Sequence, residues 1–162
     1  MNVTFDTRRF DKRMKHFLNV ADKAVPIIER ESISHFKRAF TDGGFTDRFF
    51  IPWKPNNASN RTLLKSGALR RSIRTMIKTK RTITIGSRLK YSKIHNEGGT
   101  IRVTGNMKSF FWLKYKETGL SKWKAMALSE KIEIPKRQFM GDSVVLRNKI
   151  IRSFVNKHIK NK

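Results

Sequence analysis

The sequence contains no cysteine, which excludes disulfides, Cys-based zinc sites, iron–sulfur clusters and thiol nucleophiles. No run approaches the roughly 18 apolar residues that would suggest a membrane span. The first residues, MNVTFDTRRFDKR, carry no hydrophobic signal segment. We therefore expect synthesis and work in a reducing cytoplasm, with no membrane partner.

Acidic residues are scarce: 12 Asp and Glu stand against 37 Lys and Arg, for a formal net charge of +25. Residues 1–47 hold nine bases and seven acids, 97–162 hold fifteen and five, and 48–96 hold thirteen bases and no acid. Such a stretch cannot neutralise itself through local ion pairs, so it must face water, counterions or an anionic partner. One interpretation is solubility with a Lys-rich bias; the other is contact with phosphates or acidic protein surfaces.

The 162 residues correspond to a single domain spanning 1–162. Twelve Phe and three Trp suffice for a modest core, so the chain is not a disordered polycation. Apolar residues recur at three- and four-residue steps over 8–41, which predicts a helix. Asp6 or Thr7 can cap its start, Pro26 should kink or split it, and Gly43 and Gly44 should end it.

Residues 43–62 are rich in Pro, Asn and Gly and predict a long loop anchored by aromatic side chains. These aromatics could stack on bases or tuck back onto the core. A short helical turn from Leu63 should run into a strand pair, Ile73–Lys80 and Thr82–Ser87, joined at Lys80-Arg81. Beyond it we expect a helix at 90–96, strands at Thr100–Thr104 and Lys131–Ile134, and an aromatic insertion at 105–130, carried by a helix or a loop.

Asp142 can cap a final amphipathic helix at 142–160, with Val144, Ile151, Phe154, Val155 and Ile159 facing inward. The expected fold class is α+β: a small, mainly antiparallel sheet packed with a long kinked N-terminal helix and a C-terminal helix.

His95 and Glu97 are the only pair with a catalytic pattern. Their spacing of two does not place them on one helical face, and no third ligand stands nearby. The other histidines show no metal-binding spacing, and no Walker loop is present. We expect no enzymatic activity, metal, cofactor or small-molecule substrate.

An ordered series of short motifs runs through the second half of the chain. Leu64-x-Ser66-Gly67-x-Leu69-x-x-Ser72-Ile73 precedes Ile85-Gly86-Ser87, then Tyr91-x-x-Ile94-His95-Asn96-Glu97-Gly98-Gly99, and finally Ile134-Pro135-x-Arg137-x-Phe139-Met140-Gly141. This order and spacing resemble the phage virion morphogenesis family, which includes Mu-type protein G and related tail-completion and head–tail joining proteins. The resemblance covers about residues 53–145. The insertion at 105–130 has no role that can be carried over.

The resemblance implies a structural virion protein of a tailed phage or prophage, forming a homo-oligomeric ring at the tail–neck junction. Its expected partners are other phage neck and tail proteins, with packaged DNA as a further contact. It would be made in the host bacterial cytoplasm and reside in the virion. The alternative is a basic nucleic-acid-binding protein of phage DNA packaging or regulation, which the charge alone supports.

Three sets of candidate residues follow. The interface candidates are Phe49, Phe50, Trp53, Phe110, Phe111, Trp112 and Trp123. The electrostatic candidates, for acidic neighbours or DNA, are Arg70, Arg71, Arg74, Lys78, Lys80 and Arg81. The family-like structural positions are Gly67, Leu69, Tyr91, His95, Gly98, Gly99, Pro135, Arg137 and Phe139. Arg137 is expected to pair with an acid such as Glu97 or to make a subunit contact.

Overall fold

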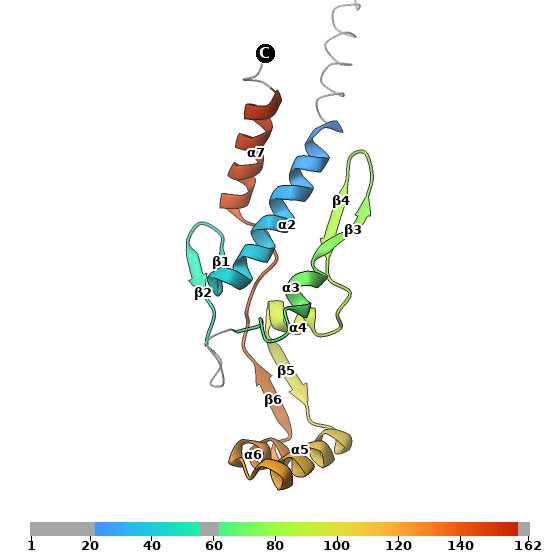
Figure 1. The fold of residues 1–162 in the computed structure, drawn as a ribbon, viewed down its shortest axis with the longest axis vertical. Coiled ribbons are helices and arrows are strands. Elements are labelled where there is room, and N and C mark those ends of the chain that lie inside the picture. Colours follow the sequence, from blue (N-terminus) through green and yellow to red (C-terminus); the bar gives the residue numbers. More distant parts are fainter. Residues whose placement is uncertain (1–21, 56–61, 159–162) are drawn as a thin grey trace, which may run out of the picture. The chain divides into compact units, whose positions relative to one another are not determined.

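The computed structural model describes residues 22–55 and 62–158 (Figure 1). The chain divides into two compact units: unit 1 comprises Met1–Leu89 and Phe139–Lys162, and unit 2 comprises Lys90–Gln138. The α+β class is confirmed, with a C-terminal helix as expected. The described strands form three separate two-stranded antiparallel sheets instead of one small sheet. A single domain over 1–162 stays a prediction.

Helix α2, Ala24–Asp42, is the long helix of unit 1 and confirms the second half of the predicted 8–41 helix. The first part of that prediction, with its caps at Asp6 or Thr7, lies outside the described residues. Pro26 falls in the first turn of α2, where a backbone N–H has no intrahelical acceptor to lose. Gly43 ends the helix in the left-handed conformation, at φ 71°.

The predicted loop at 43–62 is wrong in part, because it contains a hairpin. Strand β1, Gly44–Thr46, pairs antiparallel with β2, Phe50–Pro52. The Trp53 N–H donates to the Gly43 carbonyl at 2.8 Å and continues the pairing by one step. Three-residue strands show no alternation long enough to be recognised in a sequence.

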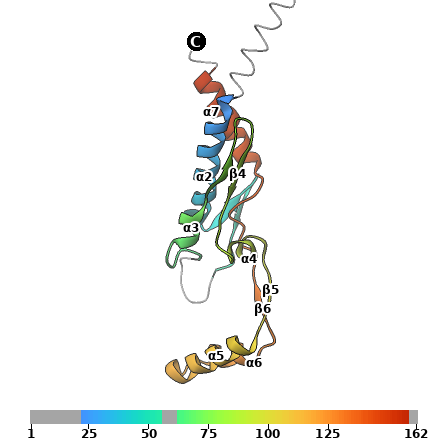
Figure 2. The ribbon, with the colours of Figure 1, turned by 90° about the vertical axis from the view of Figure 1, so that its right-hand side faces the viewer.

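The predicted turn and strand pair after Leu63 are confirmed as α3, Ala68–Ser72, followed by β3, Arg74–Lys78, and β4, Ile83–Gly86. The two strands pair antiparallel with a bulge between Thr75 and Ile77. Figures 1 and 2 show this hairpin beside α2, with α7 along another side of the same helix.

Helix α7, Val144–His158, closes unit 1. Asp142 is not its cap: the Ser143 hydroxyl accepts from the Leu146 N–H at 3.0 Å, and the Asp47 carboxylate accepts from the Val144 N–H at 2.8 Å. The inward face was also misassigned at one described position, because Ile150 packs against the core while Ile151 is exposed. The predicted inward Ile159 lies outside the described residues. The core of unit 1 consists of Phe36, Ala39, Phe40, Phe45, Trp53, Leu69, Ile73, Phe139 and Leu146.

Unit 2 begins with α4, Ser92–Glu97, and continues into a hairpin of β5, Gly99–Arg102, and β6, Lys131–Ile134. The strand at Lys131–Ile134 has the predicted bounds. Between the strands, the insertion is a pair of helices, α5 at Gly105–Thr118 and α6 at Ser121–Leu128. A small core of Val103, Phe111 and Ala127 holds this helical pair to the hairpin.

Candidate interaction surfaces

An apolar tip projects from the β1–β2 hairpin of unit 1. We call Phe49, Phe50 and Ile51 the hairpin tip; their exposed fractions are 80%, 48% and 60%. Gly44 lets the Phe50 ring lie close across the hairpin, since a Cβ at Gly44 would come within 2.6 Å of that ring. Large apolar side chains this exposed indicate a contact surface when they adjoin one another.

Trp53 has a different place from the hairpin tip. It is buried in the core of unit 1, where its ring meets Phe40 edge-on at 5.5 Å between centroids. The side chain therefore serves the fold and is not accessible to another molecule in this conformation. Of the unit 1 interface candidates, Phe49 and Phe50 remain available.

The helical pair of unit 2 carries a second apolar surface. Phe110 and Trp112 are exposed, whereas Phe111 is buried and stacks on the half-buried Trp123 at 6.1 Å between centroids. Further exposed apolar side chains of this helical pair were not among the interface candidates; they are Leu113, Leu120 and Leu128. A helical wheel would have placed Leu113 with Phe110, three residues away, but the choice between helix and loop was open.

The six electrostatic candidates are all exposed and all lie in unit 1. Lys78 is already paired, because its ammonium binds the Glu29 carboxylate of α2. Arg71 donates to the Ser66 carbonyl at 2.9 Å. Arg70, Arg74, Lys80 and Arg81 have no ion pair within the described ranges 22–55 and 62–158.

Arg71 and Arg74 line a shallow hollow together with Arg88, which was not among the electrostatic candidates. We call this site the arginine hollow; its volume is about 360 Å³ and its lining residues are Ala68, Arg71, Ser72, Arg74, Arg88 and Leu89. No carboxylate lines it. The chemistry of three guanidiniums around one space suits an oxyanion, because each presents a planar fork of donors.

The Ser66-Gly67-x-Leu69 motif shapes the arginine hollow. Gly67 adopts φ 66° ahead of α3, and a Cβ there would lie 2.9 Å from the Arg71 guanidinium. Leu69 is buried and fixes α3 to the core. Ser72 donates its hydroxyl to the Leu69 carbonyl at 2.7 Å and lies 2.7 Å from the Ser87 hydroxyl. The motif therefore holds the backbone that presents Arg71 and Ser72.

The remaining family-like positions lie in unit 2, at α4, the start of β5 and the chain after β6. The exception is Phe139, which is fully buried in unit 1. Gly98 adopts φ 75°, and a Cβ there would lie 2.8 Å from the Lys136 backbone nitrogen. Gly99 opens β5 opposite Ile134, and Pro135 directly follows β6. These residues bring the end of α4 close to the chain after β6.

His95 and Arg137 meet at this same place. The Arg137 N–H donates to the His95 carbonyl at 2.8 Å, and both side chains are largely covered. Burial lowers the pKa of His95, and the charge of Arg137 lowers it further. The buried Nδ1 of His95 has no hydrogen-bond partner among the residues described, and the Tyr91 ring packs edge-on against the imidazole at 5.9 Å. This packing is consistent with the structural role expected for His95.

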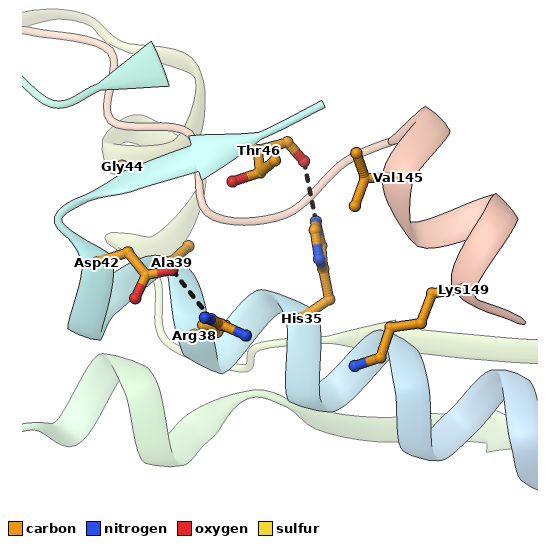
Figure 3. Close-up of a pocket in the computed structure, with 8 residues that line it drawn as sticks. All are labelled: His35, Arg38, Ala39, Asp42, Gly44, Thr46, Val145 and Lys149. Atoms are coloured by element: carbon orange, nitrogen blue, oxygen red, sulfur yellow. Dashed lines mark hydrogen bonds and ion pairs between the residues drawn. The ribbon is translucent and has the colours of Figure 1, made fainter. Parts of the chain in front are cut away.

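A small pocket of about 280 Å³ lies between α2, β1 and α7 in unit 1 (Figure 3). His35 lines it and lies 3.0 Å from the Thr46 carbonyl through Nε2. Burial lowers the pKa of His35, while the Thr46 carbonyl opposes that shift. The cations around the pocket are engaged: Arg38 with Asp42 at 3.1 Å and Lys149 with Glu31 at 3.0 Å.

Within 22–55 and 62–158, no three His, Asp or Glu side chains gather closely enough to hold a metal ion. Among the same described residues, none of the helices combines the length and apolarity that a membrane crossing requires.

The described residues thus present an exposed apolar hairpin tip in unit 1, exposed apolar side chains on α5 and α6, and the arginine hollow. A family model for the phage virion morphogenesis family matches residues 51–160. The chain belongs to the phage virion morphogenesis family, and its role is in building a phage particle, with other phage proteins as partners. That membership is consistent with the expectation of a structural, non-enzymatic role. Neither the curated proteins nor the solved structures contain a match.

Proposed function

We propose that the protein is a tail-completion or head–tail joining protein of a tailed phage or prophage, which assembles as a ring at the tail–neck junction. Family membership supports the general role. The observation that supports the specific role is the exposed hairpin tip. Phe49, Phe50 and Ile51 are large apolar side chains that are exposed to water on a hairpin whose two strands have three residues each. Such a surface is stabilised when another protein covers it.

The test is to remove the coding sequence from the phage genome and to supply the protein from a plasmid. Electron microscopy of the lysate should show filled heads and separate tails without the protein, and joined particles when the wild-type chain is supplied. The variant Phe49→Ser/Phe50→Ser/Ile51→Ser should fail to restore joining. Lys116→Ser/Lys124→Ser, changed on the exposed surface of unit 2, is the control and should restore it. Normal particles without the protein would refute the proposal.

A second candidate is the binding of nucleic acid in DNA packaging or regulation, and the exposed bases Arg70, Arg74, Lys80 and Arg81 favour it. A protein that contacts phosphates loses affinity steeply with salt, by about 10³–10⁵ between 50 and 200 mM for six to ten contacts. A salt titration with duplex DNA measures this directly. If DNA binding weakens steeply with salt and the protein is absent from phage particles, this candidate would be favoured over the first.

A further inference from the structure

The hairpin of β1 and β2 has an open backbone edge. In an antiparallel pair, residues that exchange N–H···O bonds with the opposite strand alternate with residues whose N–H and C=O point outward. The bond from the Trp53 N–H to the Gly43 carbonyl at 2.8 Å fixes this alternation. Two steps along, Phe45 and Ile51 form the next bonded pair. The N–H and C=O of Phe50 therefore point away from β1.

The outer edge of β1 is occupied within unit 1, whereas that of β2 is not. The Thr46 carbonyl of β1 accepts from His35 Nε2 at 3.0 Å (Figure 3) and from the Ser143 hydroxyl at 2.9 Å. Phe50 lies opposite Thr46 in the hairpin. Within 22–55 and 62–158, no group forms a hydrogen bond with the N–H or C=O of Phe50. The outer edge of β2 is therefore free to pair with another strand.

The two ends of β2 restrict what can pair with this edge. Pro52 has no N–H, so beyond Phe50 the edge offers only a carbonyl. Arg48, just ahead of the strand, is exposed and has no ion pair in the part of the chain that the structure describes. Proline and charge are features that keep an edge strand from pairing indiscriminately. They leave one short apolar register at Phe50, with a cation at one end.

We propose that β2 takes up an additional strand, an extended segment of another phage protein that pairs with Phe50 and covers the hairpin tip. This inference rests on the proposed function, which it deepens by naming how the joining partner binds. In this mode of recognition, main-chain hydrogen bonds supply affinity and the neighbouring side chains supply specificity. The added segment presents apolar side chains to Phe49 and Ile51. It presents a carboxylate to Arg48, because that arginine is unpaired on a chain of net charge +25.

A second copy of the chain fits this edge less well than a different protein does. Two copies that paired through β2 would use the same edge twice, which closes a two-fold dimer and not a ring. Each copy also brings a net charge of +25, so the two copies repel one another. An acidic segment of a different protein meets neither obstacle.

Removing one N–H tests the backbone pairing in the full-length chain. Phe50→Pro and Phe50→Ala both remove the aromatic ring, but only proline removes the N–H, which no bond within the hairpin uses. The probe is a lysate of the deletion phage, which supplies filled heads and separate tails. Electron microscopy then gives the concentration of added protein at which half of the particles are joined. Circular dichroism and thermal unfolding verify that each variant is folded.

The two Phe50 variants should differ in the joining assay. Phe50→Ala should raise the half-joining concentration by about tenfold, because an apolar contact is lost. Phe50→Pro should raise it by about a further tenfold or more, because the added strand loses a hydrogen bond and keeps an unpaired carbonyl. Arg48→Glu should also raise it by about tenfold. Arg152→Glu changes the net charge equally at an exposed position of α7, so this control should join like the wild type.

Amide hydrogen exchange gives a readout that needs no substitution. In the free protein the Phe50 amide should exchange quickly, whereas the Ile51 amide, which is bonded to β1, should exchange more slowly. In joined particles the Phe50 amide should slow by about tenfold or more, because the added strand then bonds it. This measurement decides the question if Phe50→Pro fails to fold.

Three results would overturn the added strand. A folded Phe50→Pro chain could join as well as Phe50→Ala, or the Phe50 amide could exchange equally fast in joined particles. Alternatively, analytical ultracentrifugation could show a wild-type dimer that Phe50→Pro abolishes, which would assign the edge to a second copy. If Phe49→Ser/Phe50→Ser/Ile51→Ser fails to join heads to tails while either of the first two results holds, the proposed function stands and the added strand is wrong.

Discussion

Replacing Glu31 with glutamine removes the charge that joins α2 to α7. The Glu31 carboxylate is 8% exposed and binds Arg30 at 2.7 Å, Lys149 at 3.0 Å and the Ser153 hydroxyl at 3.3 Å. Lys149 and Ser153 belong to α7. The carboxylate therefore holds the last helix of the chain against the first described one.

The cost of that replacement follows from how buried each partner is. Hydrogen bonds to charged groups contribute about 1.5–3 kcal/mol when buried, and exposed ion pairs about 0.2–1 kcal/mol. Arg30 and Lys149 are 63% and 48% exposed, so we take intermediate values. Glu31→Gln should lower the free energy of unfolding by about 2 kcal/mol at pH 7. For a chain of this size that corresponds to a fall in Tm of about 4–8 °C.

The loss should also depend on pH. The hydrogen bond from Arg30, opposed by burial and aided by Lys149, lowers the pKa of Glu31 below its ordinary 4.5. A lowered folded-state pKa contributes stability that is complete above about 4.5 and disappears as the pH falls through the folded value. Urea unfolding at a series of pH values should show the gap between wild type and variant closing in acid. A gap that is independent of pH would refute the electrostatic reasoning. Glu117→Gln, in an exposed pair with Lys114, is the control and should cost at most about 0.5 kcal/mol.

Other expected outcomes concern backbone geometry, capping and exposed aromatics. Gly98→Ala should lower the free energy of unfolding by about 2–4 kcal/mol, because Gly98 has a positive φ and the new Cβ would lie close to the Lys136 backbone nitrogen. Gly119→Ala should lower it by about 1 kcal/mol, because Gly119 has a positive φ but open space around it. Asp47→Ala should cost about 1–2 kcal/mol and speed amide exchange at the start of α7, whereas Asp47→Asn should retain most of the stability. Phe49→Ser should leave Tm unchanged but reduce incorporation into particles, while Trp53→Ser should lower Tm by several degrees.

The elements that could be predicted are those whose local pattern is long or sharply bounded. The strand at Lys131–Ile134 alternates and ends at a proline, and its bounds were found. The α5 helix also had local signals: the Thr104 hydroxyl accepts from the Met107 N–H at 3.4 Å, and Gly119 ends the helix at φ 65°. Reading those caps together would have decided between helix and loop.

The parts that escaped prediction depend on contacts between distant residues. The carboxylate of Asp47 serves the first residue of α7, 97 positions later, and no local rule assigns a cap to another element. Trp53 and Phe49 are likewise both aromatic, so the sequence does not show which of them is buried. Only the packing of Phe40 against Trp53 shows which of the two is in the core. The arginine hollow was found only in part, because Arg88 joins Arg71 and Arg74 through the turn of the chain after β4.

The division of the chain has a consequence for its synthesis on the ribosome. Unit 1 is discontinuous, and its core requires Phe139 and Leu146, which are translated after the whole of unit 2. Residues 1–89 therefore leave the ribosome with an incomplete core and cannot finish folding until the last helix follows. Unit 2, by contrast, is contiguous and can fold as it emerges. The nascent chain thus presents its inserted unit 2 first, and the surfaces of unit 1 become competent to bind only after α7 has been translated.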